Sequence, residues 1–344
     1  MLIKRIRKSL KRISQIPLIQ HKPYYQILIE VINWTISNRG TVNDYFDYEL
    51  YVKNKNPNEY IKRRQYLKID RKINSTKYYS ILEDKYFFHH IVSGNGLNLP
   101  NTLYLIENSS IFSLVAKNYI SVETFLENDF DGFCKVINGW GGSNIFLIEI
   151  FNKKLKFNGD NMSVSDLFKL LGSKKFLIQE RIIQHKDMIL LNPSCINTLR
   201  IVTIKIGHII HIFHVIQRIG INGSYVDNSL SGNIFIGVHK DSGKLMDYAI
   251  KPDVQNFKIY EHPQTNIVFK DFSIPFYNEA IEMTKSLHLL FQQFFMIGWD
   301  IGITPEGPIV IEGNQVADLY YAQLLFGGLK SEYLSYSHEY QTMH

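Results

Sequence analysis

The stretch "GWDIGITPEGPIVIEGN", residues 298–314, has the pattern of a β-hairpin. Its centre, "PEGP" at 305–308, supplies turn residues between two runs of alternating hydrophobic side chains. Alternation over this length places one set of side chains on one face of each strand. The hydrophobic set consists of Ile297, Trp299, Ile301 and Ile303 on the first strand, and Ile309 and Ile311 on the second.

Three polar residues share the opposite face of this hairpin: Asp300, Glu312 and Asn314. The short turn is expected to bring Asp300 within about one residue of facing Glu312. Neighbouring antiparallel strands are about 4.8 Å apart, so the two carboxylates should lie close together. Two carboxylates and an amide oxygen at this spacing suit Mg²⁺. The alternative is a solvent-exposed hairpin with salt bridges. That alternative needs Lys or Arg on the strands, and "DIGIT" and "VIEGN" contain neither, which favours the metal site.

A glycine-rich loop lies earlier, in "DGFCKVINGWGGSNIFLIEI" at 131–150. Its loop residues can bring backbone N–H groups close to phosphate oxygens, and Lys135 on the preceding strand can reach the same phosphates. A glycine loop alone predicts a plain hairpin turn equally well. The order of lysine, glycine loop and carboxylate hairpin is a more specific sign of a nucleotide site. The loop residues are Gly139, Gly141, Gly142 and Ser143.

The whole chain predicts an α+β protein with two or three lobes, since it has 344 residues of which 45% are hydrophobic. Residues 1 to about 85 are expected to be mainly helical, and a further helix in "LEDKYFFHHIVSG" should end at the glycines that follow. Short β-rich runs begin near residue 100. The predicted strands are 102–106, 132–137, 145–151, 176–182, 196–206 and 209–216, and the predicted helices among them are 163–172 and 275–295.

The net charge of +6 is concentrated at the start, where the first 13 residues contain six Lys or Arg and no acid. Such a segment can lie on an anionic membrane, where each basic residue contributes about 1 kcal/mol of binding free energy. It can equally pack a few hydrophobic residues on the body, and both interpretations stay open. The segment is too short and too charged to span a bilayer, and no run resembles a signal peptide. Nucleic acid binding is less favoured, because no base-reading motif is present.

Cysteine and histidine give no convincing site. Cys134 and Cys195 lie in apolar strand-like contexts, which suits reduced thiols in a cytoplasmic protein. His208, His211 and His214 recur every three residues, so on a strand they point to opposite faces. We therefore expect imidazoles that face solvent rather than a shared metal.

Several motifs taken in order resemble those of ATP-grasp enzymes, in particular the sugar-transfer-associated ATP-grasp family of capsule and O-antigen polysaccharide synthesis. They extend from about residue 43 to residue 314, and "INTLRIVT" and the hairpin are the most specific. The others are "NDYFDYELY", "EDKYFFHHIV", "FCKVINGWGGSNIF", "FLIQERIIQH" and "YVDNSLSGNIFIGV". One departure is Val136, which follows Lys135 where many superfamily members have proline.

The resemblance implies an ATP-grasp fold, in which two α+β lobes hold a nucleotide between them, preceded by a mainly helical N-terminal region. It implies residues 1–109 as that N-terminal region, 110–182 as the small lid lobe with the glycine-rich loop, and 183–344 as the central lobe with the Mg²⁺ hairpin.

The resemblance also assigns roles. Lys135 would hold the α- and β-phosphates under the loop from Gly139 to Ser143. The backbone of Gln179, Glu180, Arg181 and Ile182 would meet the adenine edge, and either Asp187 or His185 would bind the ribose. Asp300, Glu312 and Asn314 would bind one or two Mg²⁺ ions, and Arg200 would contact the γ-phosphate. Arg218, Asp227 and Asn228 would bind or orient the acceptor, although a surface turn explains these three almost as well.

The implied reaction is that of a carboxylate–amine ligase, which uses ATP to form an acyl phosphate and then an amide. The implied substrates are a sugar acid of a surface polysaccharide or its precursor and an amine or amino acid, at the inner face of the cell membrane or in the cytoplasm. Two alternatives stay open: an ATP-grasp kinase that phosphorylates a sugar hydroxyl, and a non-catalytic assembly factor with a residual nucleotide site.

Overall fold

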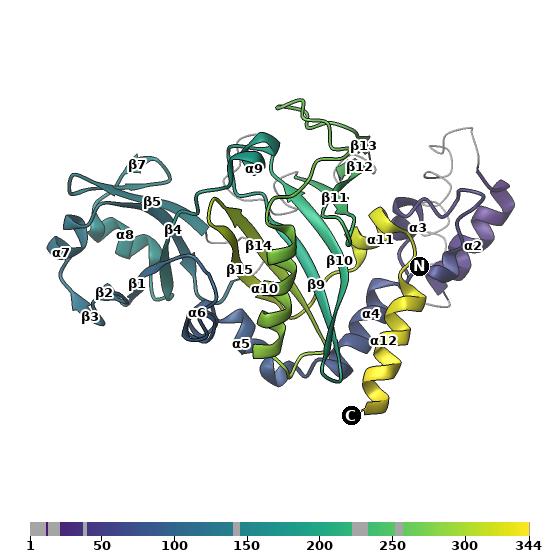
Figure 1. Cartoon of the computed structure of the whole chain (residues 1–344), viewed down its shortest axis with the longest axis horizontal. Coiled ribbons are helices and arrows are strands. Elements are labelled where there is room, and N and C mark those ends of the chain that lie inside the picture. The colour runs from purple at the N-terminus through teal and green to yellow at the C-terminus, as the bar shows by residue number, and fades with distance from the viewer. Residues whose placement is uncertain are drawn as a thin grey trace.

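The computed structural model describes residue 12 and residues 21–36, 40–139, 145–221, 233–251 and 257–343. Helices predominate before residue 95, and two antiparallel sheets follow, each with helices packed against it (Figure 1). This is the predicted α+β organisation with a helical N-terminal region. No helix of the described residues is long and apolar enough to cross a bilayer.

The N-terminal region is built from short helices with recognisable starts. Thr41 and Asp44 form a capping box at the first turn of α3, and Asp84 caps α6 by accepting from the N–H groups of Tyr86 and Phe87. The helix predicted before the glycines ends at Gly94. The elements are α2 (Tyr24–Ile36), α3 (Val42–Asp47), η1 (Pro57–Glu59), α4 (Arg63–Ile73), η2 (Thr76–Tyr78), α5 (Tyr79–Glu83) and α6 (Lys85–Gly94).

The first sheet, called here the N-terminal sheet, contains strands β1–β8 in the order β3-β2-β1-β8-β4-β5-β6-β7. Helix α8 has Ser163 as its N-cap and Gly172 as its C-cap, in agreement with the helix predicted over 163–172. The sheet begins at Thr102 and ends at Glu180, and the domain boundaries after 109 and 182 stay predictions. The elements are β1 (Thr102–Glu107), β2 (Ser110–Ser113), β3 (Asn118–Ile120), α7 (Val122–Glu127), β4 (Phe130–Val136), β5 (Ile145–Phe151), β6 (Lys154–Phe157), β7 (Asp160–Asn161), α8 (Val164–Leu171) and β8 (Phe176–Glu180).

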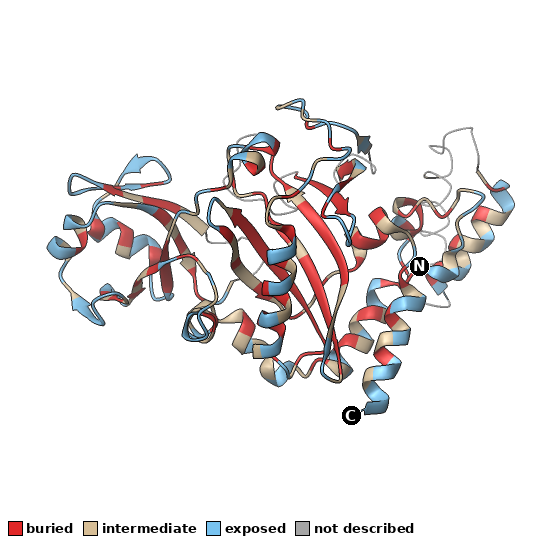
Figure 2. Ribbon diagram, viewed as in Figure 1, coloured by how far each residue is buried: buried red, intermediate tan, exposed pale blue. Residues whose placement is uncertain are grey.

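The second sheet, called here the C-terminal sheet, has the order β13-β12-β11-β10-β9-β14-β15. Its strands are largely buried (Figure 2). The elements are α9 (Lys186–Leu191), β9 (Leu199–Ile206), β10 (Ile209–Ile219), β11 (Ile234–Val238), β12 (Leu245–Lys251), β13 (Phe257–Ile259), α10 (Tyr277–Leu290), β14 (Met296–Thr304), β15 (Gly307–Asn314), α11 (Tyr320–Phe326) and α12 (Lys330–Met343).

Both faces of the C-terminal sheet are covered by helices. Alternate residues of its central strands point to opposite faces, as in Ile201 and Val202, so each face contributes to a separate hydrophobic core. One core includes α5, α6, α9 and α10, and the other includes α4, α11 and α12. This two-sided cover makes β9 and β14 a buried base for the polar groups that they carry.

Two predicted elements differ in detail from the structure. The helix expected over 275–295 spans only Tyr277–Leu290, because the buried ring of His288 hydrogen-bonds to the carbonyl oxygen of Phe294 and the chain turns there. The hairpin has a register shift after Asp300, and the buried hydrophobic side chain of β15 is Val310. Ile309 and Ile311, the hydrophobic set predicted for this strand, are only partly buried.

Candidate active site

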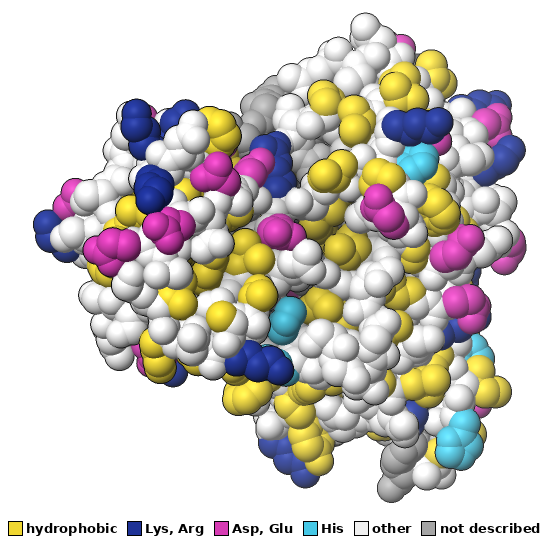
Figure 3. All heavy atoms as spheres, turned by 60° about the vertical axis from the view of Figure 1, so that its left-hand side comes forward, with side chains coloured by type: hydrophobic (Ala, Val, Ile, Leu, Met, Phe, Trp, Pro, Cys, Tyr) yellow, Lys and Arg dark blue, Asp and Glu magenta, His cyan; other side chains and the backbone are white. Residues whose placement is uncertain are grey.

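A cavity of about 880 Å³ lies between the two sheets and the segment that joins them. Its size is typical of ligand sites in proteins. With the N-terminal sheet turned forward, hydrophobic side chains gather in the middle of the surface, where the two lobes meet (Figure 3). The predicted site residues that line the cavity are Lys135, Gln179, Glu180, Arg181, Ile182, Arg200, Arg218, Asp300, Glu312 and Asn314.

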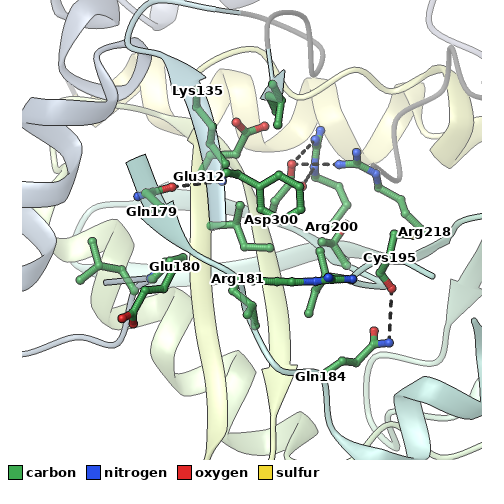
Figure 4. A pocket seen from close by; sticks show the side chains of 18 of the residues that line it. Lys135, Gln179, Glu180, Arg181, Gln184, Cys195, Arg200, Arg218, Asp300 and Glu312 are labelled. Carbon is green, nitrogen blue, oxygen red and sulfur yellow. Dashed lines mark hydrogen bonds and ion pairs between the residues drawn. The ribbon is translucent and has the colours of Figure 1, made fainter. Parts of the chain in front are cut away.

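Asp300 is the centre of the polar cluster. In the register of the sheet, Asp300 lies opposite Glu312 of β15 on one side and opposite Arg200 of β9 on the other. Arg200 donates to both of its carboxylate oxygens, and Nη1 of Arg218 lies 2.9 Å from Oδ2 (Figure 4). Burial opposes ionisation of Asp300, yet the two guanidinium groups hold the pKa of its carboxyl well below the ordinary value.

The two arginines correct one step of the sequence argument. The hairpin strands contain no Lys or Arg, but the cationic partner of Asp300 comes from the neighbouring strands β9 and β10. Asp300 is therefore charge-compensated before any ligand is considered. The prediction that Arg200 and Arg218 belong to the same site as the hairpin acids agrees with these contacts.

Glu312 has a different environment from Asp300. Burial and the nearby negative charge of Asp300 raise the pKa of the Glu312 carboxyl, while Lys85 opposes this shift. Nδ2 of Asn314 lies 3.4 Å from Oε1 of Glu312 and 3.5 Å from Oδ2 of Asp300. Two carboxylates and an amide thus converge from adjacent strands, with the amide nitrogen of Asn314 turned toward both carboxylates.

This set fits Mg²⁺ when the amide of Asn314 presents its oxygen, because two carboxylates and an amide oxygen are hard ligands that leave room for water and phosphate. In the described part of the chain, no group of three or more His, Cys, Asp and Glu side chains is arranged to hold a metal. The predicted ligand set contains two acidic side chains, Asp300 and Glu312.

Lys135 approaches the cluster from β4 of the N-terminal sheet. Its Nζ donates to Oε1 of Gln179 at 3.0 Å. Burial lowers the pKa of Lys135 to about 8, although the charge of Glu312 works against this shift. Gly139 is the last described residue after β4, and its carbonyl oxygen accepts from Nζ of Lys85 at 3.1 Å. Gly141, Gly142 and Ser143 lie outside the described residues, as do Asp227 and Asn228.

The segment predicted to meet adenine runs along the cavity. A side chain at Gly132 would come within 2.2 Å of the carbonyl oxygen of Gln179, so glycine lets β4 and β8 approach closely there. His185 and Asp187 are not among the described residues that line the cavity. Instead, Nδ1 of His185 accepts from the N–H of Asp187 at the start of α9. Their assignment to the ribose stays a prediction.

Gln184 is a functional candidate that the sequence did not reveal. It lines the cavity, and its Oε1 accepts from the backbone N–H of Asn197 at 2.6 Å. Its Nε2 donates to the carbonyl oxygen of Cys195 (Figure 4) and also to that of Asn192. These buried bonds fix the segment that leads into β9 and therefore the position of Arg200. Such a network depends on contacts distant in sequence, so no local pattern predicts it.

His214 corrects a second expectation. We expected imidazoles that face solvent, but His214 is only 3% exposed and lines the cavity. The shift in register between Ile212 and His214 changes the face to which the strand presents it. Neither ring nitrogen has a hydrogen-bond partner among the described residues. Burial, together with the charges of Arg200 and Lys240, lowers the pKa of His214 to about 3, so the ring is neutral.

Sequence comparison agrees with these features of fold and site. The residues from 63 to 333 match the family described as sugar-transfer associated ATP-grasp. The chain therefore belongs to the sugar-transfer associated ATP-grasp family, and the predicted ATP-grasp fold is confirmed. None of the curated proteins compared with the chain matches its sequence.

Solved structures provide more distant similarities. D-alanine–D-alanine ligase from Helicobacter pylori is 13% identical, with a TM-score of 0.43 over 75% of this chain and 61% of that chain. An ADP complex of N5-carboxyaminoimidazole ribonucleotide synthetase is 11% identical, with a TM-score of 0.42 over 76% of this chain and 52% of that chain. The ATP-grasp ligase PsnB, complexed with a precursor peptide and AMPPNP, is 14% identical, with a TM-score of 0.39 over 77% and 61%. This chain thus spans between about half and three fifths of the length of those chains.

Proposed function

We propose that this protein is an ATP-dependent carboxylate–amine ligase that forms an amide through an acyl phosphate. The observation that carries the proposal is the cluster of Asp300, Glu312, Arg200 and Arg218, which faces Lys135 within one cavity. Cations on two sides of a carboxylate pair suit a triphosphate and its divalent ion. Family membership supports ATP as the nucleotide.

The cofactor of the proposed reaction is Mg²⁺, one ion or two. Asp300, Glu312 and Asn314 would hold it, and it would neutralise phosphate charge. Lys135 would bind the α- and β-phosphates, and Arg200 would stabilise charge at the γ-phosphate. These roles require that Asp300 share its charge between the two arginines and the cation.

The acyl transfer itself needs alignment more than covalent help from the protein. The substrate carboxylate attacks the γ-phosphorus, and the bond between that phosphorus and the bridging oxygen breaks to release ADP. An amine then attacks the acyl carbon, and phosphate leaves with the oxygen that bridged carbon and phosphorus. Arg218 would bind the acceptor carboxylate beside Arg200, and the predicted roles of Asp227 and Asn228 in orienting the amine belong to the same proposal.

We assign the carboxylate substrate to a sugar acid of a surface polysaccharide or its precursor. The family description supports an association with sugar transfer.

Product analysis tests the reaction. Purified protein is incubated with ATP, Mg²⁺ and a matrix of hexuronic acids and amines, and ADP, phosphate and coupled product are measured. Ligation gives the three in equal amounts. A phosphorylated sugar without free phosphate would show a kinase instead, and no turnover with any pair, in a protein that binds ATP, would favour the assembly factor.

We also propose that the protein works in the cytoplasm, at the inner face of the membrane, through its basic N-terminus. Residues 1–11 and 13–20 lie outside the described part, and the one described residue between them, Arg12, pairs with Asp47 at 2.7 Å. Co-sedimentation with anionic liposomes should be strong for the full chain and weak for a chain without residues 1–13. Equal sedimentation of both would contradict the proposal.

A further inference from the structure

A row of hydrogen-bonded side chains leads from α6 to Lys135. Nδ1 of His89 lies 2.9 Å from Oγ1 of Thr102, which lies 3.0 Å from Nε2 of Gln179. Oε1 of Gln179 in turn lies 3.0 Å from Nζ of Lys135, as Figure 4 shows. The four residues belong to four different elements, α6, β1, β8 and β4. Thr102 and Gln179 are both buried, with 6% exposure each.

The chemistry of these groups fixes the direction of two of the three bonds. The ammonium group of Lys135 is a donor only, so the carbonyl oxygen of Gln179 must face it. The amide N–H of Gln179 then donates to Thr102. In the neutral tautomer of His89 with its proton on Nε2, Nδ1 accepts the hydroxyl proton of Thr102. Burial and the neighbouring His90 lower the pKa of His89, which agrees with a neutral ring.

The row also crosses the junction of the two sheets. Helix α6 packs in the core of the C-terminal sheet through Phe88 and Val92, and Phe88 stacks on Phe291. Its polar side contacts the N-terminal sheet, where Nζ of Lys85 donates to the carbonyl oxygen of Gly139. His89 is therefore fixed to one sheet, while Thr102, Gln179 and Lys135 belong to the other.

We propose that His89 and Thr102 are positioning residues for Lys135. They hold the amide of Gln179 in the orientation that presents an oxygen to the lysine, so that the remaining two N–H groups of Nζ are directed at phosphate. This inference rests on the proposed ATP site. The affinity for phosphate would then depend on the contact between His89 of α6 and Thr102 of β1. Neither residue belongs to the predicted nucleotide site.

Paired affinities for ATP and adenosine test the inference, because adenosine has the base and the ribose without the phosphates. Both ligands compete with a fluorescent ATP analogue on the full chain with Mg²⁺. Thr102→Val keeps the shape of the side chain and removes the hydroxyl group. We expect about fivefold to tenfold weaker ATP binding, as for the loss of one hydrogen bond in a charged chain, and unchanged adenosine binding.

Conservative replacements and a matched control complete the experiment. Thr102→Ser restores the hydroxyl group and His89→Asn places an amide oxygen near the position of Nδ1, so both should bind ATP within about twofold of the unaltered chain, whereas His89→Phe should match Thr102→Val. Ser113→Ala removes another buried hydroxyl of the same sheet, one that accepts from the N–H of Ala116, and should change neither affinity.

The outcomes separate the two levels of the argument. An unaltered chain that binds no ATP would overturn the proposed function and this inference with it. ATP binding that is unchanged in Thr102→Val and His89→Phe would overturn the inference alone, as would equal losses for ATP and adenosine, which indicate a general loosening of β8. If Thr102→Val does not fold, the comparison of His89→Phe with His89→Asn decides.

Discussion

The two sheets supply opposite halves of the site and are built differently. In the C-terminal sheet, β14 is buried along both faces except at its last residue, and Asp300 lies within it. In the N-terminal sheet, β4 alternates between buried and less buried positions, and Lys135 occupies a partly buried one. The acids and arginines are therefore set in a rigid, two-sided core, whereas the lysine is held by a few side-chain contacts. A change in the first group should affect folding and binding together, and a change in the second should affect binding alone.

The largest effect is expected from Asp300→Asn. This change leaves Arg200 and Arg218 without their shared carboxylate in a buried position. Removing one partner of a buried ion pair typically costs about 3–5 kcal/mol of unfolding free energy, and ADP release should also be lost. Urea unfolding and the ADP assay measure the two effects.

The matched control for that change is Asp271→Asn. Asp271 belongs to the same lobe and pairs with Lys244, but its side chain is 67% exposed. Its loss should cost at most about 1 kcal/mol and leave ADP release unchanged. Equal stability of the two variants would show that the cluster at Asp300 is not buried and compensated as described.

A pH effect is expected from Asp70, which accepts from Asn74, the residue that bonds to Met296 of the C-terminal sheet. Burial raises the pKa of its carboxyl to about 7, although hydrogen bonds from Asn74 and Tyr79 oppose the shift. Between about pH 4 and pH 7 the folded chain holds a proton that the unfolded chain has released, so stability falls as pH rises. The expected loss is about 3 kcal/mol over this window. Unfolding of Asp70→Asn, measured across the same range, should lack that part of the pH dependence, and parallel curves would contradict the assignment.

A smaller and more selective effect is expected from Lys135→Met. It removes a charged hydrogen-bond donor from the N-terminal half of the site, so ATP should bind about 10- to 100-fold more weakly. Unfolding free energy should change by less than about 1 kcal/mol, because the lysine contributes little to the core. Calorimetric titration provides the affinity, with Lys154→Met, an exposed lysine of β6, as the control. A large loss of stability would mean that the two halves are equally rigid.

The smallest effect is expected from Glu127→Gln, which breaks an exposed ion pair with Lys153 in the N-terminal lobe. Exposed pairs of this kind contribute about 1 kcal/mol or less. Both thermal unfolding and ATP affinity should stay close to those of the unaltered chain. A measurable change in affinity would show that the outer surface of this lobe is coupled to the site.

The same contrast explains what the sequence predicted. Alternating hydrophobic residues and turn residues located the hairpin and brought Asp300 opposite Glu312, because both are local patterns. Local patterns also predicted the other strands named above and the helix over 163–172. The partners of Asp300 were missed because Arg200 and Arg218 approach from strands about 100 and 82 residues away in sequence.

Irregular backbone accounts for the other differences. A register shift moves His214 from an expected solvent position into the cavity wall, and another moves Val310 into the core. Neither shift has a marker in the sequence, since bulges depend on how neighbouring strands fit together. The row from His89 to Lys135 is likewise invisible in sequence, because it combines single residues of four elements.

The central claim is that the two halves meet on one nucleotide. A crystal structure of the full chain with AMPPNP and Mg²⁺ tests it most directly. The account predicts a triphosphate between Lys135 and the hairpin, with oxygen atoms of Asp300, Glu312 and Asn314 on the metal. A nucleotide bound elsewhere, or a triphosphate from which those three side chains turn away, would contradict it.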